Sequence, residues 1–389
     1  MQSKKGPRKT GGMKSLSSIR SDLLSRGVSL AKMTASAGAK MAQSKLGEML
    51  TGEDASGERA KKLLVSQAQL FAKEMGQLKG SLMKVGQMLS MYGEHFLPPE
   101  ANNILKTLQF QSPPLEWKVV AKTLAHEFGA ERLAQLAIEP VPMASASIGQ
   151  VHRARVRATQ QVVAIKIQYP GVDQAIENDM RTLKSIFSVT KLLPQIPHFD
   201  HLLLEIKDML TQELDYQKEM QFTIKYRNAL AHDQRYVVPN VLTEFSTHRV
   251  LTSEFVEGFT IDSPEVQALS LERRNRLGLA ALELYLMELF VWGFVQTDPH
   301  LGNYRVKIDP NGEDDRLVLF DFGALREFSP EFCSNYQQLV QASINKDMAQ
   351  LKLAAIRLGF SEKNDPQSLD QLFADFCFQI VEPFEGSYN

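Results

Sequence analysis

The chain has 389 residues, of which 43% are hydrophobic, and its 44 basic and 45 acidic side chains leave a formal net charge of -1. This apolar fraction excludes a wholly disordered protein, and the length is enough for two or three domains. Because the chain as a whole has no basic excess, we expect no nucleic-acid partner. The two cysteines form no CxxC pair, so neither a disulfide framework nor a zinc site is expected.

The beginning of the chain differs from the rest because it is basic. Up to Lys45 it carries ten Lys or Arg residues and a single acid, Asp22. We therefore predict that residues 1–52 form a basic, flexible segment. A weak amphipathic pattern within it favours contact with an anionic lipid membrane surface, or a transit-like leader. A solvated tail is the alternative interpretation of the same pattern.

The spacing of apolar residues predicts alternating helices and strands. In chain order these are helices at 60–92 and 115–136, strands at 147–156 and 162–168, helices at 172–192 and 200–231, and strands at 237–245 and 249–256 joined by a short turn. After residue 258 the chain is predicted to be helical, apart from one hairpin near 304–320. The most apolar stretch, 281–295, is shorter than the roughly 20 residues that span a bilayer, so no transmembrane helix is expected. This order favours an α+β protein with two lobes.

The strand at 162–168 carries the first chemical signal. Alternation places Val163, Ile165 and Ile167 on one face, and Ala164 and Lys166 together on the other. A small residue beside a lysine can leave a flat apolar slot with an ammonium group at its end, which suits a purine and its phosphates. Taken alone, the strand favours the alternative interpretation, an ordinary edge-strand lysine that faces water.

The second signal flanks the predicted hairpin, whose five-residue strands are 304–308 and 316–320. If Tyr304 lies opposite Phe320, the Cα atoms of Asn303 and Asp321 lie about 5 Å apart, just beyond the paired ends. Amide and carboxylate oxygens at this spacing suit Mg²⁺. Asp298, five residues before Asn303, could then orient or deprotonate an attacking hydroxyl. A loop of turn-forming residues is the alternative.

The order of these motifs, a strand lysine, then Asp298-x4-Asn303, then Asp321-Phe322-Gly323, resembles the protein-kinase-like fold. More specifically, the chain is similar to the AarF/ADCK/UbiB family of atypical kinases, which is linked to ubiquinone (coenzyme Q) biosynthesis. Three further motifs carry this resemblance over about residues 60–380: a KxGQ motif at 84–87, an alanine-rich loop at 142–152 and an ExD motif at 213–215.

The resemblance implies a helical extension over 53–138 that carries the KxGQ motif, a small β-rich N-lobe over 139–257 and a helical C-lobe over 258–389. A Mg²⁺-adenine nucleotide, ATP or ADP, would bind between the lobes, and the alanine-rich loop would favour ADP. Asp298 would be the catalytic aspartate. Lys166 would bind the α- and β-phosphates and pair with a helix glutamate, either Glu213 or Glu205.

The resemblance also assigns the remaining site residues. Asn303 and Asp321 would hold Mg²⁺, while Lys84 and Gln87 would point into the site from a helix folded over the cleft. Ser253 would take the gatekeeper position, next to a backbone segment, Glu254 to Val256, that meets the adenine edge. The other expected nucleotide-binding residues are Ala144, Ser145, Ala146, Ser147, Val151, Ala164 and Glu213.

Three departures from kinase patterns shape the functional prediction. Gln296-Thr297 stands where typical kinases have His-Arg and this family often has His-Ala, Leu301 replaces a usual proline, and no Ala-Pro-Glu motif follows Gly323. The sequence therefore predicts an atypical kinase or ATPase that hydrolyses nucleotide or phosphorylates a small or lipid-like acceptor. It would support ubiquinone biosynthesis together with other proteins of that process, as a peripheral protein on the cytoplasmic face of a membrane or on the mitochondrial matrix side. The alternatives are a Ser/Thr protein kinase and a non-catalytic nucleotide-sensing scaffold.

Overall fold

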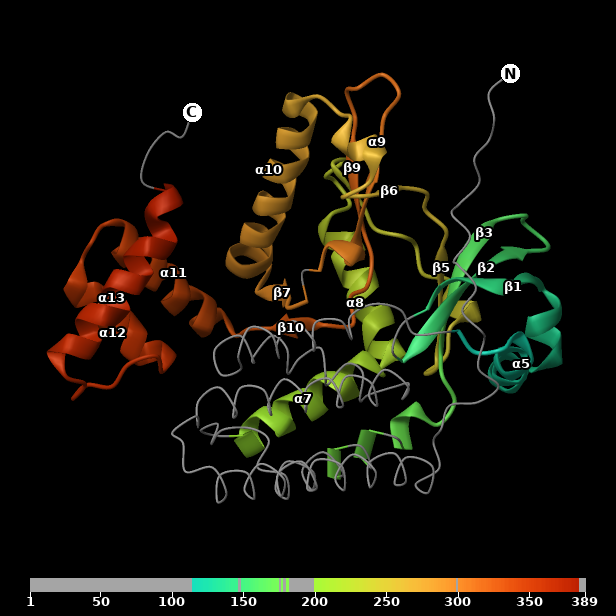
Figure 1. Cartoon of the computed structure of the whole chain (residues 1–389), viewed down its shortest axis with the longest axis horizontal. Helices are drawn as coiled ribbons and strands as arrows, with labels where there is room; N and C mark the ends of the chain where they lie inside the picture. Colours follow the sequence, from blue (N-terminus) through green and yellow to red (C-terminus); the bar gives the residue numbers. More distant parts are fainter. Residues whose placement is uncertain are drawn as a thin grey trace, which may run out of the picture. The chain divides into compact units, whose positions relative to one another are not determined.

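The structure is a computed structural model. It describes residues 114–145, 148–174, 176–177, 180–181, 199–298 and 300–384. The chain divides into two compact units, whose described parts lie within 114–228 and 239–256 for the first, and within 229–238 and 257–384 for the second. Figure 1 shows helices and sheets in both units, and the predicted α+β class is confirmed. The predicted helix at 60–92 lies outside the described residues.

A four-stranded antiparallel sheet forms the centre of the first unit. Its strand order is β1 (Leu136–Ser145), β2 (Gly149–Val156), β3 (Val162–Gln168) and β5 (Val250–Glu254). The strands predicted at 147–156 and 162–168 correspond to β2 and β3, but β1 was missed because it contains Pro140 and Pro142. Both prolines lie on an edge strand whose register shifts around Pro142, and an edge strand tolerates the missing N–H of proline.

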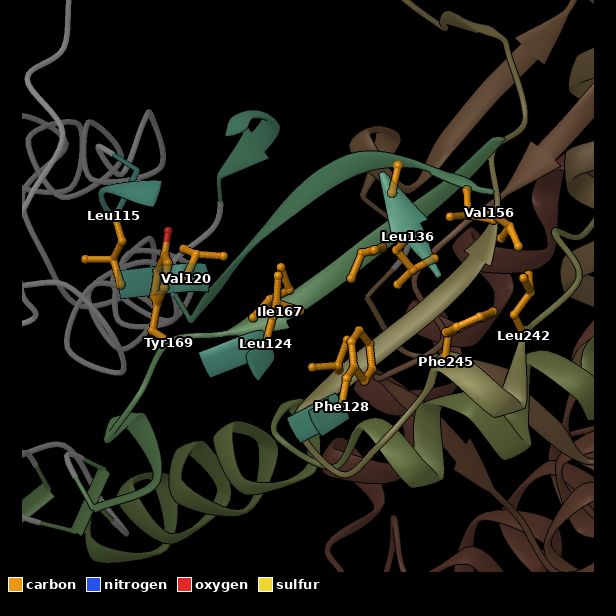
Figure 2. Packing of buried hydrophobic residues seen from close by; sticks show 14 of the residues in the cluster. Leu115, Val120, Leu124, Phe128, Leu136, Val156, Ile167, Tyr169, Leu242 and Phe245 are labelled. Atoms are coloured by element: carbon orange, nitrogen blue, oxygen red, sulfur yellow. The ribbon is translucent and has the colours of Figure 1, made fainter. Parts of the chain in front are cut away.

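The core of the first unit lies on one face of this sheet. Val163, Ile165 and Ile167 of β3 are at most 1% exposed, so the predicted alternation is confirmed. Helix α5 (Trp117–Ala134) packs against this face through apolar side chains at helical spacing, and Figure 2 shows Leu124 and Phe128 beside Ile167. The opposite face of β3, with Ala164 and Lys166, is thereby left outside this core.

The single helix predicted at 200–231 is two helices in the structure. Helix α7 (Phe199–Glu213) and helix α8 (Tyr216–Ala229) are separated by Leu214 and Asp215. The Oδ1 atom of Asp215 accepts a hydrogen bond of 2.9 Å from the backbone N–H of Lys218. An aspartate in this position caps the start of a helix, which explains why apolar periodicity alone did not reveal the break.

The second unit contains a four-stranded sheet in the order β4 (Tyr236–Val237), β9 (Arg316–Leu319), β8 (Tyr304–Lys307) and β6 (Phe259–Thr260). Strand β4 is parallel to β9, so the predicted strand at 237–245 is confirmed only in part: its first residue belongs to β4, while Val241 forms an antiparallel bridge with Ser253 of β5. Pro239 has no N–H for a ladder, and residues Thr243–Phe245 form a 3₁₀ turn (η3) instead of a strand.

The remaining elements of the second unit are mainly helical, as predicted, and include a short antiparallel pair of β7 (Phe294–Gln296) with β10 (Leu325–Glu327). Within the described ranges, no helix combines the length and the apolar character needed to cross a membrane. The helical elements are α9 (Pro264–Gln267), α10 (Leu271–Met287), the π-helical turn η4 (Glu288–Trp292), the 3₁₀ turn η5 (Leu301–Asn303), α11 (Pro330–Ile344), α12 (Met348–Leu358), α13 (Gln367–Val381) and the 3₁₀ turn η6 (Glu382–Phe384).

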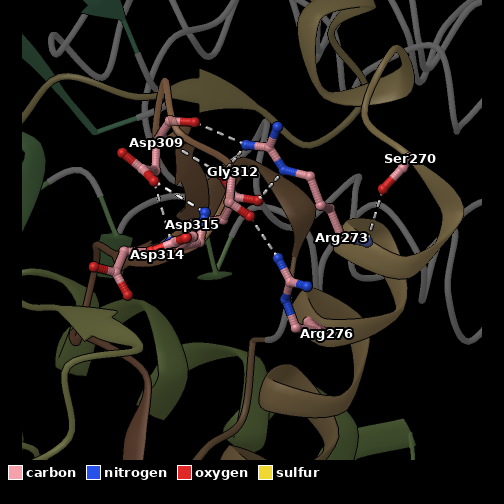
Figure 3. A network of polar contacts seen from close by, with 8 residues as sticks. Ser270, Arg273, Arg276, Asp309, Gly312, Asp314 and Asp315 are labelled. Carbon is pink, nitrogen blue, oxygen red and sulfur yellow. Dashed lines mark hydrogen bonds and ion pairs between the residues drawn. The ribbon is translucent and has the colours of Figure 1, made fainter.

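The β8–β9 hairpin is anchored to helix α10 by an arginine. Arg273 donates to the Oδ2 and Oδ1 atoms of Asp315 at 2.6 and 2.5 Å, and to the carbonyl of Asp309 at 3.0 Å. Arg276, one turn further along α10, donates to the carbonyl of Gly312 at 2.8 Å. Figure 3 shows this network, which holds the long turn between β8 and β9 at several points.

Candidate active site

In the first unit, the face of β3 that carries Ala164 and Lys166 takes part in an ion pair. The Nζ atom of Lys166 donates to Oε1 and Oε2 of Glu219 at 2.7 and 2.9 Å. The Glu219 side chain is only 4% exposed and the Lys166 side chain 23% exposed, so the ammonium group is held at a partly open surface by a buried carboxylate. The Nζ atom also lies 5.0 Å from the centre of the Tyr216 ring, a favourable cation–π position.

The carboxylate that bonds to Lys166 belongs to Glu219, a residue that the sequence analysis did not name beside Glu213 and Glu205. Both residues belong to α7, whereas Glu219 lies in the first turns of α8. Glu205 is exposed on the face of α7 opposite the buried Ile206 and Leu210. The break between the two helices turns the chain so that α8 presents Glu219 to the lysine. Because the break depends on a cap rather than on periodicity, the signal that could have identified Glu219 is the N-capping aspartate four residues earlier.

Several predicted nucleotide-binding residues share the face of Lys166. Val151 of β2 is paired with Lys166, Ala144 of β1 is paired with Val151, and Ala164 is two residues before Lys166 on the same strand. Cross-strand partners point to the same side of a sheet, so small or medium apolar side chains surround the ammonium group. Lys84, Gln87, Ala146 and Ser147 lie outside the described residues.

Ser145 differs from Ala144 because strand alternation turns it to the opposite side. Its Oγ atom lies 2.9 Å from the hydroxyl of Tyr169, a residue of the core. Burial raises the pKa of Tyr169 to about 12, although the bond to Ser145 works against that rise. Part of the predicted alanine-rich loop is strand, since Ala144 and Ser145 pair with β2.

A buried polar network supports the base of this loop. The Oε1 atom of Gln150 accepts a 2.8 Å bond from the N–H of Leu115, and its Nε2 atom lies 2.8 Å from Nε2 of His152. The Nδ1 atom of His152 lies 2.8 Å from the carbonyl of Glu139. These contacts are mutually compatible when His152 is neutral and carries its proton on Nδ1. Burial lowers the pKa of His152, partly offset by its bond to Glu139.

The segment that follows β5 was expected to meet the adenine edge. Two hydrogen bonds define its backbone path. The N–H of Glu254 donates to the carbonyl of Asn240 at 2.8 Å, and the N–H of Phe255 donates to the carbonyl of Val162 at 3.1 Å. The Arg153 guanidinium carbon lies 4.8 Å from the centre of the Phe255 ring. Ser253, the expected gatekeeper, pairs with Ala164 in the adjacent strand.

In the second unit, the loop that begins at Asp298 folds back on its own carbonyl group. The Asp298 carbonyl accepts a 2.8 Å bond from the N–H of His300 and a 3.0 Å bond from Nδ2 of Asn303. With its Nδ2 atom engaged, the Asn303 amide has its Oδ1 oxygen left to act as a ligand. Burial raises the pKa of Tyr304 to about 12, and the negative charges of Glu288 and Asp298 add to that rise.

The hairpin between the two predicted metal ligands exists, but its register differs from the prediction. Tyr304 is paired with Leu319 rather than with Phe320, and the N–H of Phe320 donates to the carbonyl of Asn303 at 2.9 Å. The shift arises because the strands close at Lys307 and Arg316, leaving an eight-residue turn that Asp315 and Arg273 hold together. Asp321 therefore follows the residue that bonds to Asn303.

Asp321 has a backbone conformation that non-glycine residues rarely adopt. Its φ angle is +60°, and its Oδ1 atom accepts a 3.3 Å bond from the N–H of Gly323. Such backbone strain persists where the surroundings hold the residue for a function. The Asp321 carboxylate and the Asn303 amide oxygen are both hard oxygen donors, so the chemistry of the residues present fits Mg²⁺. Among the described residues, no cluster of three or more His, Cys, Asp or Glu side chains suggests another metal centre.

Comparison with known proteins identifies the class. The model of the ABC1 atypical kinase-like domain matches residues 107–355, and the chain belongs to this family. The resemblance to the AarF/ADCK/UbiB kinases and the predicted kinase-like fold are thereby confirmed. One solved structure that resembles the chain is the complex of Rv3197 with erythromycin from Mycobacterium tuberculosis. It has a TM-score of 0.55 and 26% sequence identity, and the match covers 85% of this chain and 82% of that one.

Three curated relatives that resemble the chain are named as kinases. "Atypical kinase COQ8, mitochondrial" of Saccharomyces cerevisiae is 29% identical over 376 residues, 96% of this chain and 73% of the relative. "Atypical kinase COQ8B, mitochondrial" of Danio rerio is 33% identical over 323 residues, which are 82% of this chain and 50% of the relative. "Probable serine/threonine-protein kinase abkA" of Dictyostelium discoideum is 30% identical over 334 residues, 82% of this chain and 58% of the relative. The chain thus spans between half and three quarters of the length of these relatives.

Proposed function

We propose that the chain is an atypical kinase or ATPase of the UbiB type. It would bind Mg²⁺ with ATP or ADP, and hydrolyse the nucleotide or transfer phosphate to a small or lipid-like acceptor. The observation that supports this proposal most directly is the Lys166–Glu219 pair, in which a buried carboxylate holds an ammonium group on the strand face that also carries Ala164 and, on the paired strand, Val151. An arrangement of this kind suits a purine with its phosphates better than it suits a lysine that only faces water.

In this proposal, the site residues of the first unit bind the nucleotide. Lys166 binds the α- and β-phosphates, and Glu219 keeps its Nζ atom in place when no nucleotide is bound. Val151 and Ala164 lie on the same face and offer the adenine ring an apolar surface. The backbone between Glu254 and Val256 offers polar groups to the edge of the ring. Charge and shape together would favour an adenine nucleotide.

In the second unit, Asn303 and Asp321 are the residues that would hold Mg²⁺. When bound, the ion supplies positive charge that offsets the repulsion between a polyphosphate and the Asp321 carboxylate. Asp298 accepts the proton of the attacking hydroxyl or water, and its position depends on the bonds that His300 and Asn303 make to its carbonyl. The chemistry is therefore positioning plus charge stabilisation, as in other phosphoryl transfers.

The phosphate acceptor and the cellular location are proposed from the sequence and from the relatives. After Gly323 the chain passes through β10 to α11 without an Ala-Pro-Glu motif, which argues against an ordinary peptide substrate. The names of the yeast and zebrafish relatives support a role in ubiquinone biosynthesis and the mitochondrial alternative for the location. The basic segment 1–52 would contact an anionic lipid surface, and proteins of ubiquinone biosynthesis would be its partners.

Phosphate release tests the proposal. Purified protein is given ATP or ADP, with and without Mg²⁺ and with and without cardiolipin-rich liposomes, and inorganic phosphate and nucleotide affinity are measured. We expect Mg²⁺-dependent release from ATP that Asp298→Asn reduces by about 10³-fold while nucleotide binding persists. Asp321→Asn should lose Mg²⁺-dependent binding, whereas Asp314→Asn, an exposed acid in the distal turn, should behave as the wild type.

Other outcomes would identify a different function. Peptide or autophosphorylation that disappears in Asp298→Asn would indicate a protein kinase. Thermal stabilisation by nucleotide that is unchanged in Asp298→Asn, with no phosphate release under any condition, would indicate a nucleotide-sensing scaffold. Deletion of residues 1–45 should weaken binding to anionic vesicles in a salt-dependent way, and intact binding would exclude the basic segment as the anchor.

A further inference from the structure

Gln296 is a buried amide at a departure from the kinase pattern. It is the last residue of β7, two residues before Asp298, and it is 7% exposed. It pairs with Leu325 of β10, four residues after Asp321. The backbone pairing of β7 with β10, which extends to a bond from the N–H of Thr297 to the carbonyl of Ala324, therefore brings together the chain segments that carry Asp298 and Asp321.

The amide of Gln296 contacts both segments. Its Nε2 atom donates to the backbone carbonyl of Asp321 at 2.6 Å, and its Oε1 atom accepts a 3.2 Å bond from the backbone N–H of Asp298. The two bonds require opposite ends of the amide, so they determine its orientation together. The backbone N–H of Gln296 donates at 3.0 Å to Oε2 of Glu288, a carboxylate that is 3% exposed within the π-helical turn η4. The backbone of Gln296 is thus held by a buried carboxylate, in addition to the two bonds of its side chain.

We infer that Gln296 is a positioning residue that couples the aspartate of the catalytic loop to the aspartate of the metal site. The inference rests on the proposed function of Asp298 and Asp321. A side chain that donates to one loop and accepts from the other transmits a displacement of either loop to the other. Removal of the amide takes away the side-chain bonds to both loops, leaves the backbone pairing of β7 with β10 in place, and removes no group that we assign to nucleotide or Mg²⁺.

The strained backbone of Asp321 explains why this coupling matters. A residue at φ +60° returns to an ordinary conformation unless its peptide groups are held. The bond from Gln296 holds the Asp321 carbonyl, and the direction of that carbonyl sets the direction in which the Asp321 side chain leaves the chain. Loss of the bond should therefore misplace the carboxylate that we assign to Mg²⁺.

Glutamine also makes the coupling insensitive to pH. An amide donates and accepts at once at every physiological pH, whereas an imidazole loses its acceptor nitrogen when it is protonated. With histidine at position 296, the bond from the N–H of Asp298 would be lost at low pH while a donor to Asp321 remained. A Gln296→His variant therefore offers a readout that a purely structural role would not change.

Two variants of Gln296 and one matched control test the coupling by kinetics. In Gln296→Met we expect kcat to fall by about 10²-fold and the Mg²⁺ concentration at half-maximal rate to rise, with nucleotide affinity in the absence of Mg²⁺ unchanged. In Gln296→His the rate relative to wild type should rise as the pH passes the ordinary imidazole pKa of about 6.5. Gln267→Met removes an exposed amide that bonds to the carbonyl of Asp262 in the same unit, and it should change none of these values.

Amide hydrogen exchange of the protein without nucleotide separates this inference from the proposed function. Gln296→Met should accelerate exchange both at Asp298 and over 321–324, whereas Gln267→Met should accelerate neither. Acceleration confined to 294–298, or an unchanged Mg²⁺ requirement together with a flat pH ratio in Gln296→His, would overturn the coupling. If the wild type releases no phosphate, the proposed function fails, and the exchange result alone decides whether Gln296 couples the two loops.

Discussion

The Nζ atom of Lys166, on β3, bonds to both carboxylate oxygens of Glu219, on α8. The lysine comes from a strand that hydrophobic alternation identifies, whereas the glutamate comes from a helix whose start depends on the cap at Asp215. The pair therefore links the most predictable element of the first unit to one of its least predictable boundaries.

Removal of the lysine should destabilise the protein because Glu219 is buried. In Lys166→Met the carboxylate loses the ammonium group while it is only 4% exposed, and breaking a buried pair of this kind costs about 3 kcal/mol. The double variant Lys166→Met/Glu219→Met should recover most of this loss, because two apolar side chains leave no buried charge. Urea unfolding measures both changes. Lys118→Met, at an exposed position of α5, serves as the control, and a single variant as stable as this control would contradict the prediction.

Acid should weaken the first unit through His152. Burial lowers the pKa of His152 below its ordinary value of 6.5, so the folded protein binds this proton less readily than the unfolded chain does. The contribution to stability is therefore complete above about pH 6.5 and is lost as the pH falls from there towards the folded pKa, by up to about 1.4 kcal/mol per pH unit.

The measurement is the free energy of unfolding between pH 5 and pH 8. His152→Asn should remove this part of the pH dependence because it has no titrating ring. His126→Asn should keep it, because the His126 side chain is 85% exposed and lies on the solvent side of α5. An identical pH dependence in wild type and His152→Asn would show that another group is responsible.

Gly149 should not tolerate a methyl group. A Cβ atom at this position would lie 2.6 Å from the carbonyl oxygen of Ile167 and 3.0 Å from the hydroxyl of Tyr216. The carbonyl belongs to the paired backbone of β3 and cannot move away freely, so Gly149→Ala should cost about 1–3 kcal/mol. Gly278→Ala is the control: no atom lies within 4 Å of its Cβ, and alanine favours the interior of α10. Equal stability of the two variants would contradict this contact.

The turn between β8 and β9 should depend on Arg273. The bonds from Arg273 lower the pKa of Asp315, whose side chain is 3% exposed, so the pair stabilises the fold above pH 3.8 and loses its effect as the pH falls below that value. Arg273→Met should lower the melting temperature at pH 7 by several degrees, and by less at pH 3, below the ordinary pKa of the aspartate. Arg274→Met changes an exposed neighbour, and a melting temperature as high as that of this control would refute the anchoring role.

The predictions failed where a boundary depends on one backbone or side-chain contact. Strand β1 was missed because its prolines are typical of loops, and only pairing with β2 shows that an edge strand accommodates them. The segment at 237–245 was predicted to be one strand, but Tyr236 and Val237 pair with β9, far away in the sequence, and only the residues around Val241 bond to β5. The register of the β8–β9 hairpin was wrong by one residue because an arginine from another element holds its turn.

The α+β class and the two central strands β2 and β3 could be predicted from the sequence alone. The sequence also pointed to four candidate site residues, Lys166, Asp298, Asn303 and Asp321. Alternation and motif spacing are local properties, so they can be read along the chain. Only the tertiary structure decided that Glu219 holds Lys166, that Asp321 has a positive φ angle and that Gln296 bonds to both aspartate loops. The bonds from Gln296 to Asp321 and from Lys166 to Glu219 join residues that are 25 and 53 positions apart. They depend on where helices break and strands pair, and a local stretch of sequence does not contain that information.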